Sequence, residues 1–146
     1  MPEPLELRFD LPAPPDAVFA AWTEASQVLA WWRDSGVYRT VAWQADVRPG
    51  GAWRAEFIDV SGDVSTAQGR YVTVERPTRL VWTWRDSWTP DVESTIDMTF
   101  AAAGAGTAMT LVETSFASAD DRADNVEAWT AVTGWLADYL QGRRAR

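Results

Sequence analysis

The chain has no cysteine, no histidine and no lysine among its 146 residues. Without these side chains the protein cannot build a Ser-His-Asp triad, a cysteine nucleophile or a lysine Schiff base. Zinc and iron–sulfur centres of the usual kinds are excluded for the same reason. Carboxylates, hydroxyls, arginine and indole N–H groups remain available, and we therefore expect neither a metal nor any other cofactor.

Positive charge and long apolar runs are also scarce. Thirteen arginines face 21 acidic residues, which gives a net charge of −8. This is the wrong sign for a nucleic acid or an anionic membrane surface, so we expect neither as a partner. The longest apolar run, Ala17–Trp22, is far shorter than the roughly 20 residues of a membrane-spanning helix. The N-terminus is acidic and has no signal-peptide apolar region, so we expect a cytoplasmic location.

Length and composition are otherwise ordinary for a globular protein. A chain of this size can bury roughly two-thirds of its unfolded surface in one core, and we expect residues 1–146 to form a single domain. The content of tryptophan is unusually high, with ten residues. Because a buried indole N–H needs a partner, we expect some of these residues to line a pocket rather than only to fill a core.

Alternating apolar and polar residues predict a strand over residues 5–11, which a proline cluster ends. Pro15 suits the first turn of a helix whose apolar positions recur at helical spacing; these are Val18, Phe19 and Trp22. A second short helix is predicted next, with Ser26 as its cap.

The middle of the chain is strand-like, with β-branched and aromatic runs between short turn signals. The predicted strands are Tyr38–Arg48, Ala52–Val60, Ser65–Arg76, Arg79–Asp86, Val92–Ala102 and Thr107–Phe116. Most connectors are so short that neighbouring strands must be antiparallel. Residues 84–90 are expected to form a hairpin loop at the rim of a cavity.

A long final helix is predicted from the cap signal of Ser118 and Asp121. Its apolar stripe comprises Val126, Trp129, Thr133, Leu136 and Leu140. The architecture is therefore α+β: a curved, seven-stranded antiparallel sheet with two short helices and a long C-terminal helix on one face. Such a sheet can leave an apolar cavity beneath the helix.

Residues 46–54 read D-V-R-P-G-G-A-W-R. This segment resembles the D-x-R-P-G-G-x-W/F turn of bacterial proteins similar to the C-terminal domain of the Hsp90 ATPase activator, in the SRPBCC (START-like, Bet v1-like) superfamily. Segments 9–22, 29–32, 74–84 and 127–140 resemble further motifs of that family in the same order. The resemblance implies a helix-grip fold and, from members of the superfamily, hydrophobic ligands or cyclase and hydrolase activities. We interpret Gly50 and Gly51 as turn glycines rather than as a phosphate cradle.

The sequence departs from the family pattern at three places. Ala128 stands where a glycine is usual, and Thr133 with Gly134 replaces a common Leu-Asp pair. Glu113 stands where a histidine is often found near the end of the last strand.

Strand alternation turns one set of residues toward the final helix. The expected lining of an aromatic-walled chamber comprises Trp31, Trp32, Trp53, Phe57, Tyr71, Trp82, Trp84, Ile96, Met98, Phe100, Met109, Leu111, Glu113 and Trp129. A fully packed aromatic core is the alternative. The inward side of strands 38–48 and 65–76 stays undetermined, which leaves Gln44 or Asp46 as a second inward polar candidate.

Glu113 shares its face with Met109 and Leu111, so its carboxyl is expected to enter the apolar interior. Ionisation there is costly unless an indole N–H, an arginine or a ligand amine satisfies it. The alternatives are a surface glutamate at a frayed strand end and a structural pair with an arginine.

Three functional hypotheses follow. The first is binding of a small hydrophobic, aromatic molecule in the chamber. The second is a cofactor-independent cyclase-like or hydrolase-like enzyme with Glu113 as general acid or base. The third is a co-chaperone, as the resemblance to the activator implies, although we expect no binding to Hsp90. Homodimerisation stays open.

Overall fold

The computed structural model describes residues 3–32 and 38–144. Its elements, in chain order, are β1 (Leu5–Leu11), α1 (Pro15–Thr23), α2 (Ala25–Trp31), β2 (Tyr38–Ala45), β3 (Ala52–Asp59), β4 (Val64–Glu75), β5 (Arg79–Asp86), β6 (Ser94–Ala103), β7 (Gly106–Thr114) and α3 (Ala119–Arg144). The strands form one sheet in the order β1-β7-β6-β5-β4-β3-β2, and every pair is antiparallel. The predicted α+β class and strand number are confirmed.

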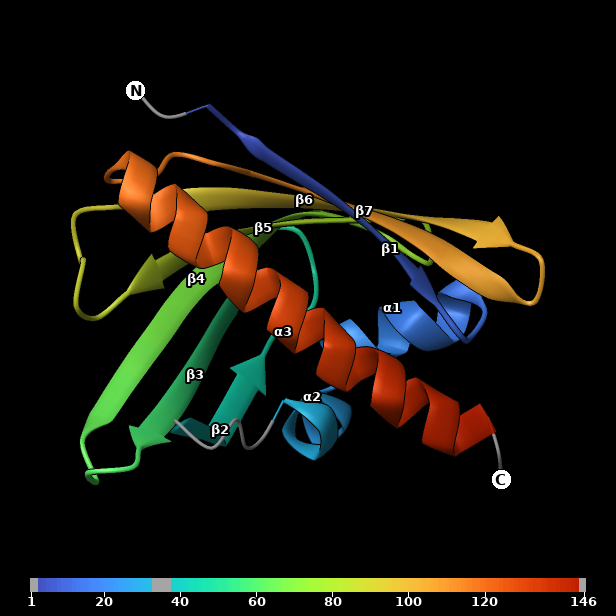
Figure 1. The fold of residues 1–146 in the computed structure, drawn as a ribbon, viewed down its shortest axis with the longest axis horizontal. Coiled ribbons are helices and arrows are strands. Elements are labelled where there is room, and N and C mark those ends of the chain that lie inside the picture. Colours follow the sequence, from blue (N-terminus) through green and yellow to red (C-terminus); the bar gives the residue numbers. More distant parts are fainter. Residues whose placement is uncertain (1–2, 33–37, 145–146) are drawn as a thin grey trace.

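The sheet is strongly curled, and α3 runs diagonally across its concave face (Figure 1). The short helices lie where the two sheet edges come near each other: α1 contacts β6 and β7, while α2 contacts β2. A long helix held in a curled sheet is the helix-grip arrangement. Its core lies between α3 and the concave face, where the inward side chains of all the strands converge.

Most element boundaries agree with the sequence within two or three residues. Pro15 occupies the first turn of α1, as predicted. Ser118 caps α3, because its hydroxyl accepts a hydrogen bond from the Asp121 amide at 3.1 Å. The prediction of Ser26 as the cap of α2 is wrong. The cap lies two residues earlier, at Glu24, whose backbone is extended and whose carbonyl accepts the first helical bonds.

The Arg-Pro-Gly-Gly turn joins β2 to β3 and is built for the fold. Gly50 has a φ of +83°, which favours glycine. A side chain on Gly51 would collide with the Asp46 carbonyl. The Gly50 amide donates to the Tyr71 carbonyl at 2.7 Å, and the Tyr71 amide donates to the Gly51 carbonyl at 2.8 Å. The turn is therefore locked to β4, and the structural interpretation of the two glycines is confirmed.

Eight of the ten tryptophans form one continuous cluster of touching rings. Their centroids lie 4.8 to 6.4 Å from those of their neighbours, mostly in tilted or edge-to-face geometry, which aromatic rings prefer. The members of this tryptophan cluster are Trp22, Trp31, Trp32, Trp43, Trp53, Trp82, Trp84 and Trp129. The cluster joins α1, α2, three strands of the sheet (β2, β3 and β5) and α3, so it holds the layers together.

Trp53 shows how an irregularity of the sheet serves the core. Between Gln68 and Tyr71, β4 loses its regular pairing with β5, and the Arg70 amide donates to the Thr83 hydroxyl instead. The Trp53 indole N–H donates to the Thr83 carbonyl at 2.9 Å. A buried indole thereby gains the partner that it needs.

We predict opposite effects of the same substitution at two glycines. Gly51→Ala should destabilise the protein by about 1–3 kcal/mol, because the new methyl group collides with backbone. Gly134→Ala should stabilise it by about 0.5–1 kcal/mol, because Gly134 lies inside α3 and an added Cβ would meet no atom within 4 Å. Urea unfolding measures both. Equal changes in the two variants would contradict the tight contact at Gly51.

Candidate functional site

A chamber of about 440 Å³ opens at one end of the concave face. It lies between the first half of α3, the hairpin end of β3 and β4, and the loop between β5 and β6. Six aromatic residues line it: Trp32, Tyr38, Phe57, Trp84, Trp88 and Trp129. The other lining residues are Asp59, Ser65, Asp86, Glu113, Asp121, Asp124, Asn125, Ala128 and Val132.

Local geometry explains why these side chains meet. Trp84 and Asp86 are two residues apart on β5 and so share its inward face. Four lining residues of α3 recur at intervals of three or four and so share one helix face; they are Asp121, Asn125, Ala128 and Val132. Trp88 lies at the mouth, where 62% of it is exposed. The predicted position of its loop at a cavity rim is therefore observed.

Five of the fourteen predicted lining residues reach this chamber: Trp32, Phe57, Trp84, Glu113 and Trp129. The other nine belong to the packed core and do not line this chamber. They are Trp31, Trp53, Tyr71, Trp82, Ile96, Met98, Phe100, Met109 and Leu111. The structure thus combines the two interpretations of the aromatic residues, because a packed cluster fills most of the interior and the chamber occupies its edge.

Glu113 points inward, as predicted, and is only 2% exposed. Its Oε1 accepts a hydrogen bond from the Trp129 indole at 2.8 Å, and its Oε2 accepts one from the Ser94 hydroxyl at 2.7 Å. No arginine among the described residues pairs with it. Burial raises the pKa of Glu113; the two hydrogen bonds oppose that rise, while the nearby charges of Asp86 and Asp121 add to it.

Asp86 is a second carboxylate of the chamber wall. Its Oδ1 accepts a hydrogen bond from the Trp84 indole at 2.6 Å. Burial raises the pKa of Asp86, the indole hydrogen bond opposes the rise, and the charge of Asp121 adds to it. Asp59 differs, because hydrogen bonds from Ser61 and Asp63 lower its pKa.

Sequence reasoning missed most of the polar lining. Asp86 could have been found by extending the Trp82, Trp84 alternation by one step. Asp121 was interpreted as part of the cap of the last helix, and Asp124 was not singled out. Extending the Trp129 stripe toward the helix start at intervals of three and four would have reached Asn125 and Asp121. Asp59 could have been found in the same way, because it follows Phe57 by two residues on β3, and Ser65 lies opposite Phe57 in the register of β3 and β4.

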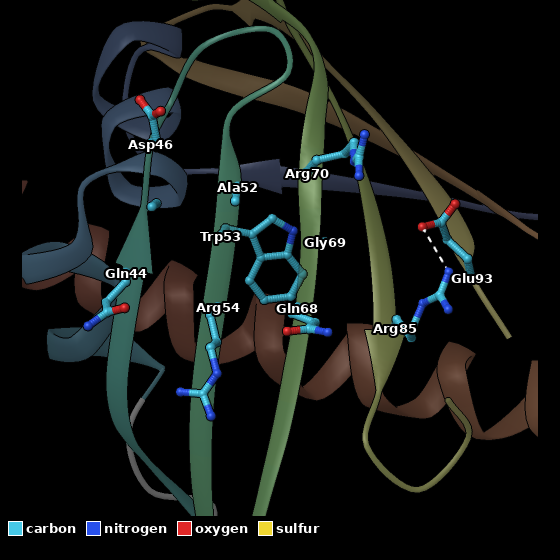
Figure 2. Close-up of a pocket in the computed structure, with 11 residues that line it drawn as sticks. Gln44, Asp46, Ala52, Trp53, Arg54, Gln68, Gly69, Arg70, Arg85 and Glu93 are labelled. Atoms are coloured by element: carbon cyan, nitrogen blue, oxygen red, sulfur yellow. Dashed lines mark hydrogen bonds and ion pairs between the residues drawn. The ribbon is translucent and has the colours of Figure 1, made fainter. Parts of the chain in front are cut away.

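A larger hollow of about 700 Å³ lies on the opposite face of the sheet. Figure 2 shows it with α3 behind the strands. Gln44 and Asp46 are exposed and line this hollow, so neither is the second inward polar group whose side of the strand the sequence left undetermined. Arg85 donates to Glu93 across it at 3.3 Å. Of the described residues that line it, only Trp53 is aromatic, so the chamber beneath α3 is the better candidate for a ligand site.

The residues that the structure describes offer neither a membrane-spanning helix nor a metal site. None of their helices is both long and apolar enough to cross a bilayer. Their acidic side chains also form no group of three that could hold a metal ion.

We predict that Glu113 makes stability depend on pH. Because its folded pKa lies above the ordinary 4.5, the stability that its proton contributes is full below pH 4.5 and is lost as pH rises through the folded pKa. In Glu113→Gln, the free energy of unfolding should fall less than in the parent as the pH rises above 4.5. The exposed Asp10 supplies the control, since Asp10→Asn should keep the parent's pH dependence. If urea unfolding between pH 4 and 8 gives Glu113→Gln the parent's slope, the raised pKa is contradicted.

Solved structures with the same fold support the architecture. A protein of Chromobacterium violaceum is 24% identical, with a TM-score of 0.87 over 96% of this chain and 98% of that one. The AHSA1-like protein from Aeromonas hydrophila is 19% identical, with a TM-score of 0.81 over 99% and 96%. DynU16, from the dynemicin biosynthetic locus, is 22% identical, with a TM-score of 0.79 over 97% of this chain and 48% of that one. At these identities the likeness shows the fold alone.

No curated protein matches the chain. One family model does, and it covers residues 12–141, from the end of β1 almost to the end of α3. The match agrees with the turn motif, the helix-grip fold and the structural relatives. The chain belongs to the family of Activator of Hsp90 ATPase homolog 1-like proteins.

Proposed function

We propose that this protein binds a small hydrophobic, aromatic molecule in the chamber beneath α3. The observation that carries the proposal is the chamber itself, whose walls hold six aromatic side chains around about 440 Å³. Ligand pockets usually have volumes of roughly 300–1,000 Å³ and combine apolar walls with a few placed polar groups. The chamber matches both parts of that description.

Three of the four indole donors at the chamber are already used within the protein. Trp84 donates to Asp86, Trp129 donates to Glu113, and Trp32 donates to the Tyr38 hydroxyl. These bonds fix the ring orientations and leave ring faces and edges for a ligand. Trp32 and Trp84 are stacked with centroids 5.7 Å apart, and Trp129 meets Trp84 edge-on at 5.9 Å. Such a wall suits a flat apolar guest.

One structural relative gives circumstantial support. DynU16 belongs to a biosynthetic locus, so a protein of this fold is encoded beside enzymes that make a small molecule. A role in handling a small organic molecule is therefore consistent with the fold of the present chain.

Catalysis by Glu113 is the second candidate function. A carboxyl with a raised pKa in an aromatic pocket suits a general acid or base. Against this, both of its oxygens already accept hydrogen bonds from protein donors. Binding without conversion requires no further group, so we place it first.

We predict that filling the chamber abolishes binding of an apolar dye. Ala128→Phe places a ring in the chamber, whereas Ala131→Phe adds the same ring at an exposed α3 position outside the lining. The neutral dye N-phenyl-1-naphthylamine should bind the parent and Ala131→Phe saturably, and Ala128→Phe at least about tenfold more weakly. Dye emission measures binding, and melting temperatures verify folding. Equal binding by all three proteins would place the dye elsewhere and would overturn the proposal.

A separate prediction distinguishes binding from catalysis. Glu113→Gln should retain dye binding, because the aromatic walls remain and the glutamine oxygen can still accept the Trp129 hydrogen bond. Candidate aromatic esters and polyketide-like substrates should be recovered unchanged from the parent protein. Turnover that Glu113→Gln abolishes while binding persists would instead establish the enzyme.

A further inference from the structure

The charged residues that line the chamber are all acidic. Five carboxylates surround it: Asp59, Asp86, Glu113, Asp121 and Asp124. They come from three strands and from the first turns of α3, so they approach from different sides. An aromatic chamber that serves only neutral ligands needs no such set, and burying carboxylates carries a cost in free energy.

No positive side chain among the described residues balances these carboxylates. The chain has no lysine, and none of the lining residues is an arginine. The two nearest arginines in sequence are engaged elsewhere. Arg85 donates to the Pro90 carbonyl and to Glu93 on the outer side of the sheet. Arg122 donates to the backbone carbonyls of Glu3 and Pro4.

The carboxylates also interact with one another. Asp86 and Asp121 each act unfavourably on the charge of Glu113, and Asp121 does so on Asp86. A positive group in their midst would replace this repulsion with attraction. The neighbouring indole rings would also attract a positive group, because the face of an indole attracts a cation. Trp84 and Trp129 hold their rings beside Asp86 and Glu113 through the hydrogen bonds described above.

A metal ion does not fit this arrangement. The described acidic residues form no group of three close enough to hold one. Carboxylates spread around an aromatic chamber instead suit an organic cation, whose charge is diffuse and whose body is apolar.

We propose that the natural ligand is an organic cation, with an aromatic or otherwise apolar body and a protonated amine or quaternary ammonium group. This inference rests on the proposed function and narrows its ligand class. The apolar body lies against Trp32, Trp84 and Phe57, and the positive group lies toward Asp86 and Glu113. Asp124 is exposed, and together with the half-buried Asp59 and Asp121 it attracts the cation to the mouth.

Three compounds that share a naphthalene ring with a one-carbon polar substituent, and differ in the charge of that substituent, test the inference by calorimetry at pH 7. They are 1-naphthylmethylamine as the cation, 1-naphthalenemethanol as the neutral compound and 1-naphthoate as the anion. The cation should bind at least about tenfold more tightly than the alcohol, and the anion most weakly. The advantage of the cation should shrink when sodium chloride is raised from 20 to 500 mM, because salt screens charge.

Charge-removing variants locate the effect. Asp86→Asn and Asp121→Asn should each reduce the advantage of the cation over the alcohol, taken as the ratio of their two affinities for the same variant, by several-fold. Glu127→Gln is the matched control, since Glu127 is an exposed acid of α3 that does not line the chamber. It should retain the parent's preference. Circular dichroism verifies that each variant is folded.

The outcomes separate the two proposals. If the cation and the alcohol bind equally, or if Glu127→Gln lowers the preference as much as Asp86→Asn, the cation inference is overturned while binding of an apolar ligand stands. If none of the three compounds and no neutral dye binds, the proposed function fails as well.

Discussion

The buried carboxyl of Glu113 is the constraint on which the rest of the site depends. It belongs to β7, and it accepts hydrogen bonds from Ser94 of β6 and from Trp129 of α3. One side chain therefore ties the long helix to the sheet at the inner end of the chamber. An apolar residue would avoid the desolvation of a carboxyl at this position, but it would leave the Trp129 indole without its partner. The height of the chamber and the orientation of its aromatic wall follow from this contact.

Behind that wall, packed rings support the rings that face the chamber. Trp32, Trp84 and Trp129 line the chamber and also belong to the tryptophan cluster. Trp22 and Trp82 fill the space behind them and are almost fully buried. Side chains held this closely have little freedom to rearrange, so the wall is ordered before any ligand arrives. Preorganisation of this kind lowers the entropy that binding must offset.

Much of this arrangement could be predicted from the sequence, because alternation along a strand decides which face a residue occupies. It correctly turned Glu113, Trp84 and Phe57 inward. Alternation does not tell where along the curled sheet a residue meets the helix, so Trp53 and Trp82 were expected at the chamber although they lie in the core. Alternation also fails to predict the face of a residue that follows a β-bulge. The register of β2 shifts between Thr40 and Ala42, and this shift fixes the outward direction of Gln44, which no local pattern reveals.

The order of the strands has a consequence for how the molecule forms during synthesis. β1 is made first but pairs only with β7, so that Leu5 lies opposite Glu113. Contacts between residues so far apart in sequence close slowly, because the intervening chain must be ordered first. On the ribosome, the first strand must wait until almost the whole sheet has emerged. Its exposed edge in that interval is a site for aberrant association.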